Sequence, residues 1–324
     1  MRKYIIIAVI IALSLAICPA AAVGGEEKVT VTQAYQPTSS QQKREDVITV
    51  MSTESGKISE IEMREYLVGC VAAEMPSHYH TQAIMAQAVA SYTYAKRTSE
   101  QNRKDSTFQA DITDSPDTHQ GYINEEKRRQ KWGENFEENE AKITAAVNEI
   151  YGKYLTFEGQ TALTLFHSIS AGVTQSAKSL WNSEIPYLSS VTSVGDKLSP
   201  DFRSEYKFSE NEIKELAESN GILLESDAGN WLGKVNRSDD GYVISVEIGG
   251  REISGAKIRE ELNLRSNFFE IYYSGGEFAV ECCGYGHCVG MSQYGADYMA
   301  RQGSSWQEIL MHYYPGTQIN NDNI

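Results

Sequence analysis

One glutamate stands where the sequence could support acid–base chemistry. Glu74 lies just before Met75-Pro76, at the end of a stripe of apolar residues with helical spacing that begins at Met63. An acid on such a stripe is costly to ionise, so we expect its pKa to rise toward the range of a general acid. Cleavage of a glycosidic bond needs such an acid, because the leaving oxygen must be protonated. The alternative is a structural carboxylate that caps a helix or pairs with Lys or Arg.

A second candidate segment follows an expected strand. Residues 166–172 read Phe-His-Ser-Ile-Ser-Ala-Gly and place His167, Ser168 and Ser170 close together. These groups could hydrogen-bond sugar hydroxyls or an N-acetyl group. The alternative is a serine-rich turn that satisfies its own backbone. A serine-protease-like triad is a poor fit, because no nucleophile elbow surrounds either serine.

A third candidate segment, residues 284–296, is rich in glycine. Its glycines permit a close approach of backbone to ligand. Polar and aromatic groups suited to carbohydrate come from His287, Ser292, Gln293 and Tyr294. The alternative is a turn whose polar groups only cap the following helix. No Gly-Lys-Ser/Thr follows, so the segment is not a phosphate loop.

The elements that must position these residues indicate an α+β fold of mixed helices and antiparallel hairpins. Pro76 closes a helix at Met75, and a second helix begins near Thr81. Capping boxes start two later helices, Ser209 with Glu212 and Ser305 with Glu308. Strands are expected at 47–51, 154–157, 162–168 and 242–248, with a hairpin over 268–282 turning at Gly275-Gly276. In the 242–248 strand, Tyr242, Ile244, Val246 and Ile248 are expected to share one face.

The net charge and the N-terminal residues limit which classes of protein this chain can belong to. The chain of 324 residues has a net charge of −15, which excludes a basic nucleic-acid footprint. Arg2 and Lys3 precede an apolar run that ends in small residues near Val23, which predicts a signal peptide or membrane anchor over 1–23. The charged end would stay in the cytoplasm and place the remainder outside it.

The expected organisation continues with a polar tether over 24–46, a main domain over 47–319 and a tail over 320–324. A charged, turn-rich stretch near 97–140 is predicted to be a mobile insertion. Cys282, Cys283 and Cys288 cluster without the spacing of a standard zinc site, so we predict free thiols and no cofactor, with zinc as the alternative.

Together the motifs resemble the stage II sporulation protein D family, which also includes amidase-enhancer proteins of the LytB type. The matching segments are spread over 47–319: residues 71–76, 83–94, 167–172 with 186–188, 258–266, 286–296 and 312–317. Family members often read Gly-His-Gly-Val-Gly, whereas this chain has Cys288 at the third position. The resemblance also implies that His119 contributes to the cleft; relatives with cysteine beside this histidine differ from this chain, which has Thr118 and Gln120.

The resemblance implies a peptidoglycan lytic transglycosylase with a central glycan-binding cleft and Glu74 as its acid/base. It implies glycan contacts from the His167 and His287 segments and 1,6-anhydro ends as products. In sporulating relatives such a protein thins the septal wall during engulfment beside an amidase, which implies an extracytoplasmic domain on a membrane anchor, or a secreted one if the leader is cleaved.

Two rival functions stay open. One is plain hydrolysis of the glycan, with Asp111 or Asp114 as the base for water. The other is a non-catalytic glycan-binding protein that stimulates an amidase, as the enhancer branch of the family suggests. Conversion of Glu74 to Gln separates the enzyme from the enhancer.

Overall fold

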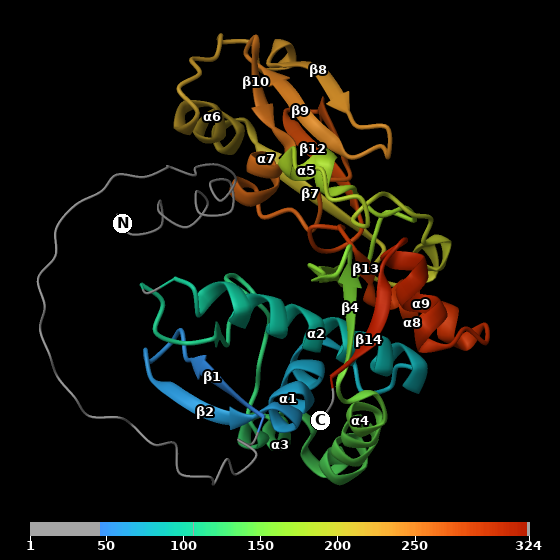
Figure 1. Ribbon diagram of the computed structural model, residues 1–324. Coiled ribbons are helices and arrows are strands. Elements are labelled where there is room, and N and C mark those ends of the chain that lie inside the picture. The colour runs from blue at the N-terminus through green and yellow to red at the C-terminus, as the bar shows by residue number, and fades with distance from the viewer. Residues whose placement is uncertain (1–45, 106, 323–324) are drawn as a thin grey trace, which may run out of the picture. The chain divides into compact units, whose positions relative to one another are not determined.

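The computed structural model describes residues 46–105 and 107–322 (Figure 1). The expected leader over 1–23 and all but Asp46 of the expected tether lie outside the described residues. The described chain mixes helices with several mostly antiparallel sheets, so the predicted α+β class is confirmed. Among the helices of the described ranges, none is both long and apolar enough to cross a membrane.

Helices dominate the first hydrophobic core, which is built around α1 and α2. Met75 takes an extended conformation before Pro76 and ends α1, as predicted. Alanines along α2 are fully buried and let its neighbours approach closely. This core and its flanking sheets comprise β1 (Val47–Met51), β2 (Ile58–Glu62), α1 (Met63–Glu74), α2 (Thr81–Asn102), β3 (Ile112–Thr113), α3 (Glu125–Trp132), η2 (Gly133–Asn135), α4 (Phe136–Ile150), β4 (Lys153–Phe157), β5 (Gln160–Thr161), β6 (Phe166–His167), α5 (Ala177–Trp181), η3 (Val194–Leu198), β13 (Met291–Ser292), α8 (Gln293–Arg301), α9 (Trp306–Tyr313) and β14 (Gln318–Asn321).

A second hydrophobic core lies between two antiparallel sheets of three strands, with the orders β10-β9-β8 and β11-β12-β7. The predicted hairpin is present as β11 and β12, and both predicted capping boxes form, at α6 and α9. The elements of this part are β7 (Arg203–Ser209), α6 (Glu210–Ser219), η4 (Ala228–Asn230), β8 (Leu232–Arg237), β9 (Val243–Ile248), β10 (Arg251–Ser254), α7 (Gly255–Glu261), β11 (Phe269–Ser274) and β12 (Glu277–Cys283).

Two strand predictions were wrong in detail. Ile244 is 46% exposed rather than on the buried face of β9, because a register shift against β8 leaves it as an extra residue between Val243 and Ser245. The expected strand over 162–168 is reduced to β6, which pairs in parallel with β13 from far along the chain.

Residues 97–105 and 107–140 contribute elements that pack around the first core. α2 continues to Asn102, β3 pairs in parallel with β1, and α3 packs beside α1 and α4. At the other end, β14 pairs with β4 through Asn321, so residues 320 and 321 belong to the fold and not to a tail.

Candidate active site at the end of helix α1

Glu74 lies at the last position of α1 with its carboxyl group half-buried. Oε1 accepts a hydrogen bond from the Gly121 backbone N–H at 2.7 Å. Burial raises the pKa of Glu74, while the hydrogen bonds from Gly121 and the Gln293 side chain and the charge of Lys131 act in the opposite direction. The net result is a carboxyl group that holds its proton more tightly than an exposed glutamate.

Two glycines bring the segment around Gly121 against α1. A Cβ on Gly121 would lie 2.8 Å from Glu74 Oε1, so only glycine allows the observed hydrogen bond without a shift. A Cβ on Gly69, inside α1, would lie 2.4 Å from the Tyr122 ring. The Ile123 N–H donates to the Gly69 carbonyl at 3.3 Å. Close backbone approach at both positions therefore fixes the donor that faces Glu74.

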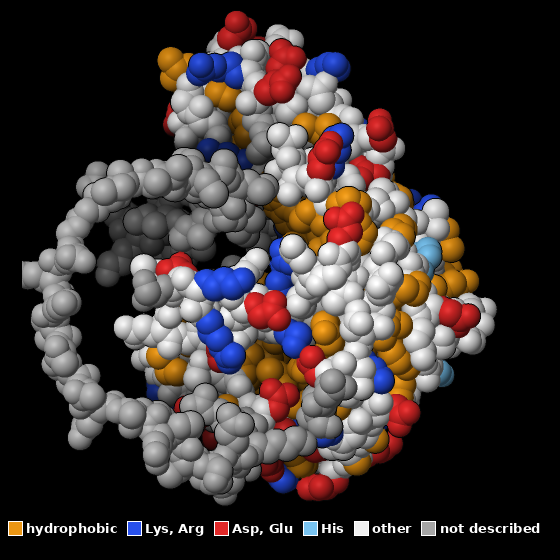
Figure 2. All heavy atoms as spheres, in the orientation of Figure 1, with side chains coloured by type: hydrophobic (Ala, Val, Ile, Leu, Met, Phe, Trp, Pro, Cys, Tyr) orange, Lys and Arg blue, Asp and Glu red, His pale blue; other side chains and the backbone are white. Residues whose placement is uncertain are grey.

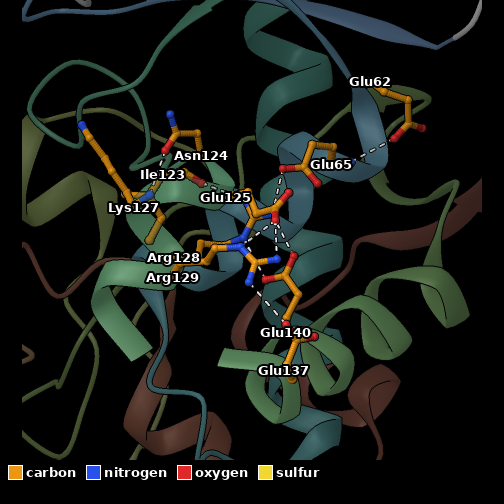
Figure 3. A network of polar contacts seen from close by, with 10 residues as sticks. All are labelled: Glu62, Glu65, Ile123, Asn124, Glu125, Lys127, Arg128, Arg129, Glu137 and Glu140. Atoms are coloured by element: carbon orange, nitrogen blue, oxygen red, sulfur yellow. Dashed lines mark hydrogen bonds and ion pairs between the residues drawn. The ribbon is translucent and has the colours of Figure 1, made fainter. Parts of the chain in front are cut away.

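A buried arginine holds the same segment from the other side (Figure 3). Arg128 of α3 is fully buried and donates to the Ile123 carbonyl at 3.1 Å. It also pairs with Glu65 of α1 and Glu140 of α4, each at 2.8 Å. Because the three charges come from three helices, they tie α1, α3 and α4 to the segment that carries Gly121.

Lys131, one turn after Arg128 on α3, satisfies the C-terminal end of α1. Its Nζ donates to the Ala72 carbonyl at 2.7 Å. A cation at the C-terminus of a helix is favourable, and here it also approaches Glu74 without forming an ion pair with it. Among the described residues, Glu74 therefore neither caps a neighbouring helix nor forms an ion pair with Lys or Arg, the two structural roles that the sequence left open.

Glu74 opens on a hollow of about 370 Å³ that is lined in part by Thr53, Asp114 and Lys127. A second hollow, of about 310 Å³, adjoins it and shares Asp114, Tyr122 and Lys127. Glu74 thus lines one of two adjoining hollows, and the described residues do not show the single central cleft that the resemblance implies. On the face in Figure 2, acidic and basic side chains are interspersed.

A chain of buried amides links Glu74 to the glycine-rich segment. Gln293, the first residue of α8, approaches the Glu74 carboxyl and donates to Gln87 Oε1 at 3.4 Å. Gln87 in turn donates to Ser91 Oγ at 3.1 Å. Gln120, beside Gly121, donates to the Ser91 carbonyl at 3.2 Å. The first and third candidate segments therefore meet at Glu74 through Gln293.

The two loop histidines lie side by side, with ring centroids 5.8 Å apart. His167 Nδ1 faces the Val289 carbonyl at 3.1 Å, so Nδ1 carries the proton and Nε2 is an acceptor. His287 Nδ1 accepts from the Val289 N–H at 3.1 Å. Burial lowers the pKa of His167 to about 3 and that of His287 to about 4, so both rings are neutral at pH 7.

The serines of the two loops have different roles. Ser170 and Ser292 are fully buried and donate to the carboxylate of Asp196, Ser292 at 2.8 Å. Ser168 contributes its carbonyl, which accepts from the Tyr294 N–H at 3.0 Å. The Tyr294 ring lies edge-on to Tyr79 at 6.3 Å. The loops are therefore joined to each other through Asp196, and glycan contact by these residues stays a prediction.

His119 is held by the segment that precedes it. Its Nδ1 accepts from the Thr113 N–H at 3.1 Å, and burial lowers the pKa of the ring.

Of the two candidate bases for water, one is already fully hydrogen-bonded. Asp111 is buried and accepts from Arg103 at 2.6 Å. Its hydrogen bonds outweigh the effect of burial and lower its pKa to about 2. Both of its oxygens are occupied, which removes it as a base for water. Asp114 lines the same hollow as Glu74 and keeps that possibility open.

The cysteines do not form a visible metal site. Cys70, Cys282, Cys283 and Cys288 are free thiols. Across residues 46–105 and 107–322, no three His, Cys, Asp or Glu side chains are grouped to hold a metal ion. Cys288 is fully buried with φ +60°, a backbone conformation that favours glycine.

Gly121, Lys131 and Asp196 were missed by sequence reasoning. Gly121 stands between Gln120 and Tyr122 in a stretch without periodicity, and Asp196 lies in an unremarkable Val-Gly-Asp turn. Lys131 carried a weak signal, since it is one of many charges on the polar helix α3. Each matters only through a partner distant in sequence.

The chain is similar to one family model and to several known proteins. Residues 51–157 match the family model described as "SpoIID: Stage II sporulation protein". The chain is 36% identical over 273 residues to stage II sporulation protein D of Bacillus amyloliquefaciens, covering 84% of this chain and 78% of that protein. The protein of the same name from Bacillus subtilis (strain 168) gives the same identity and coverage. An amidase enhancer of Bacillus subtilis (strain 168) is 23% identical over 308 residues, covering 78% of this chain and 40% of that protein.

Proposed function

We propose that this chain, which belongs to the stage II sporulation protein D family as its motifs predicted, is a peptidoglycan lytic transglycosylase with Glu74 as its acid/base. The observation that carries the proposal is the environment of the Glu74 carboxyl group. Its carboxyl group opens on a hollow, burial raises its pKa, and a backbone N–H at 2.7 Å orients it. This is the environment that a general acid needs near neutral pH.

The proposed reaction begins with protonated Glu74. Its proton passes to the oxygen that joins C1 of N-acetylmuramic acid to N-acetylglucosamine, and the C1–oxygen bond breaks with its electron pair on the leaving oxygen. The Glu74 carboxylate then takes the proton of the muramic C6 hydroxyl, whose oxygen bonds to C1. The product is a 1,6-anhydro sugar, no water is consumed and Glu74 regains its proton.

Three neighbours support this cycle. The Gly121 N–H stabilises the carboxylate that exists between the two proton transfers. Gln293 and Lys131 act in the same direction from the other sides of the group. One carboxyl group suffices, because the substrate's own hydroxyl replaces the water that a second carboxylate would activate in a hydrolase.

The test is digestion of purified peptide-free glycan strands, with mass spectrometry of the products. Wild type should yield anhydro ends, which are lighter by one water than hydrolysed ends. Glu74→Gln should lower the rate by at least about 10²-fold, because loss of the proton donor removes general acid catalysis. Glu60→Gln, on the exposed part of β2, is the matched control and should keep the wild-type rate. Hydrolysed ends would instead point to Asp114 as a base.

A second function is favoured by the similarity to an amidase enhancer. In that case the chain binds glycan and stimulates a cell-wall amidase without cleaving the strand. Wild type and Glu74→Gln would then stimulate the amidase equally, and neither would release anhydro ends.

We further propose that residues 1–23 anchor the chain in the cell membrane with residues 47–319 outside the cytoplasm, where peptidoglycan and an amidase of septal wall remodelling are its partners. The apolar run behind Arg2 and Lys3 supports this placement. Alkaline extraction of membranes tests it, because an anchored chain stays with the lipid. Recovery of a chain that begins after Val23 in the medium would show secretion after cleavage.

A further inference from the structure

Helix α3 is docked by polar side chains and not by an apolar face. Of its eight residues, all within the described part of the chain, only Arg128 is buried. The others are charged or polar, apart from the half-buried Trp132. A helix without an apolar stripe gains little from burial of hydrophobic surface, so specific polar contacts must fix its position.

Arg128 supplies such contacts to two helices and to the backbone (Figure 3). Its Nε and Nη2 donate to the two carboxylate oxygens of Glu140 at 2.9 and 2.8 Å. Nη2 also donates to Glu65 at 2.8 Å, and Nη1 donates to the Ile123 carbonyl at 3.1 Å. A buried ion pair adds little net stability compared with apolar side chains of similar size. It does favour one geometry, because any other arrangement leaves a buried charge unpaired.

The Ile123 carbonyl belongs to the short segment that carries the donor to Glu74. Gly121 lies two residues earlier, and its N–H donates to Glu74 Oε1 at 2.7 Å. Asn124 follows directly and is the N-cap of α3. Because only Tyr122 and Ile123 separate Gly121 from this N-cap, a shift of the helix would move the donor.

We propose that Arg128 is a positioning residue that holds the Gly121 N–H against the Glu74 carboxyl group, an inference that rests on the proposed function. Among the described residues, Arg128 pairs with Glu65 and Glu140 and forms no ion pair with Glu74. It therefore acts through the segment that it fixes. The Gly121 donor stabilises the Glu74 carboxylate after the first proton transfer, and a displaced donor would slow that transfer.

The first measurement is the titration of the Glu74 carboxyl group by carbon NMR in the full chain, with its signal assigned as the one that is absent from Glu74→Gln. Arg128→Lys keeps the positive charge but loses the planar guanidinium that contacts both glutamates and the Ile123 carbonyl at once. This variant should raise the pKa of Glu74 by roughly 0.5 to 1, because a hydrogen bond to the carboxylate is weakened.

The second measurement is the rate of anhydro-end formation as a function of pH. In Arg128→Lys, kcat should fall by about tenfold or more, because the carboxyl group is less well oriented. The decline of kcat/KM at high pH should begin at a higher pH than in wild type, by the same amount as the pKa of Glu74 rises. KM should change less than about twofold, since Arg128 lines neither of the two hollows.

Arg129→Lys is the matched control. Arg129 neighbours Arg128 on α3, but its ion pairs with Glu125 and Glu137 lie at the surface. The control should leave both the titration of Glu74 and the rate unchanged.

Two further variants separate positioning from stability. Val246→Ala removes buried methyl groups from the second hydrophobic core, which contains no residue of α1 or α3, so it should lower stability without moving the pKa of Glu74. If Arg128→Lys fails to fold, Glu140→Gln weakens the same network and should raise the pKa of Glu74 to a smaller extent.

An unchanged pKa of Glu74 in both Arg128→Lys and Glu140→Gln overturns the inference. A fall in rate without movement of the high-pH decline also overturns it, because Arg128 would then only support folding. An equal rise of the pKa in Val246→Ala has the same meaning. Failure of the proposed function would be seen separately, as absence of anhydro ends from wild type, while the titration would still show whether Arg128 holds the Gly121 donor.

Discussion

Two carboxyl groups, half-buried Glu74 and fully buried Asp196, differ in how completely their hydrogen-bonding capacity is satisfied. Burial raises the pKa of both. Asp196 is fully buried and accepts from the backbone and hydroxyl of Ser170 and from the hydroxyl of Ser292. Glu74 accepts one backbone N–H at 2.7 Å and opens on a hollow.

This difference distinguishes a carboxyl group with a structural role from one that can take part in a reaction. A carboxyl group surrounded by donors is fixed in position and joins elements, as Asp196 joins the loops that carry His167 and Ser292. A carboxyl group with few donors and an opening can exchange its proton with a ligand. We therefore expect reactivity from a carboxyl group that has few hydrogen-bond donors and is accessible to a ligand. Burial of the group alone does not make it reactive.

The largest effect on stability is expected at Asp196. Asp196→Ala should lower the free energy of unfolding by at least about 3 kcal/mol, because several buried donors lose their acceptor at once. Glu74→Ala should cost less than about 1 kcal/mol, since water in the hollow can reach the Gly121 N–H. Urea denaturation of both variants measures the contrast, and equal losses would contradict it.

Gly121→Ala should impair activity more than stability. The new Cβ would lie 2.8 Å from Glu74 Oε1 and push the carboxyl group away from its donor. Misplacement of a catalytic group by about 1 Å can cost about 10²-fold in rate. The measurement is the rate of anhydro-end formation beside the melting temperature.

Gly229→Ala is the control for this substitution. A Cβ on Gly229 would also face a carboxylate oxygen, that of Asp227 at 3.2 Å, but far along the chain in η4. Its activity should match wild type. A Gly121→Ala protein with the wild-type rate would show that the Gly121 donor does not position Glu74.

Local signals in the sequence predicted the elements that hold Glu74 but not its partners. Pro76 ended α1 where expected, and the two capping boxes formed because each needs only residues three positions apart. The parallel pairing of β6 with β13 and the extra residue at Ile244 depend on a partner strand, which no local pattern encodes. Gly121 and Asp196 were missed for the same reason.

Substitutions of Cys288 test whether the backbone of the loop that carries His287 is strained. The Asp196 region, where the hydrogen bonds are satisfied, is the comparison. The φ of +60° at Cys288 disfavours any side chain larger than glycine's hydrogen. Cys288→Gly and Cys288→Ala both remove the thiol, but only glycine relieves the backbone. We expect the glycine variant to be more stable by about 1 kcal/mol.

The same pair of substitutions at Cys282 provides the control. Cys282 is buried within β12, where glycine is unfavourable, so its alanine variant should be the more stable one. The same order at both cysteines would show that the conformation of Cys288 carries no strain.

The smallest effect is a pH dependence of stability that distinguishes Glu74 from a fully satisfied carboxylate. Because the folded-state pKa of Glu74 is raised by burial, its contribution to stability is fully present below the unfolded pKa and is lost as pH rises through the folded pKa. Glu74→Gln should therefore melt at a higher temperature than wild type at pH 8, and the difference should shrink toward pH 4.

Glu212 is the opposite case, since the hydrogen bonds of its capping box lower its pKa. Glu212→Gln should melt lower than wild type at pH 8, with that difference also shrinking toward pH 4, where the stability from the ionised carboxylate is lost. Melting temperatures measured across this range decide the sign. A Glu74→Gln variant that melts below wild type at pH 8 would mean that Glu74 is held as an ion, as Glu212 is, and would remove the basis for its role as a proton donor.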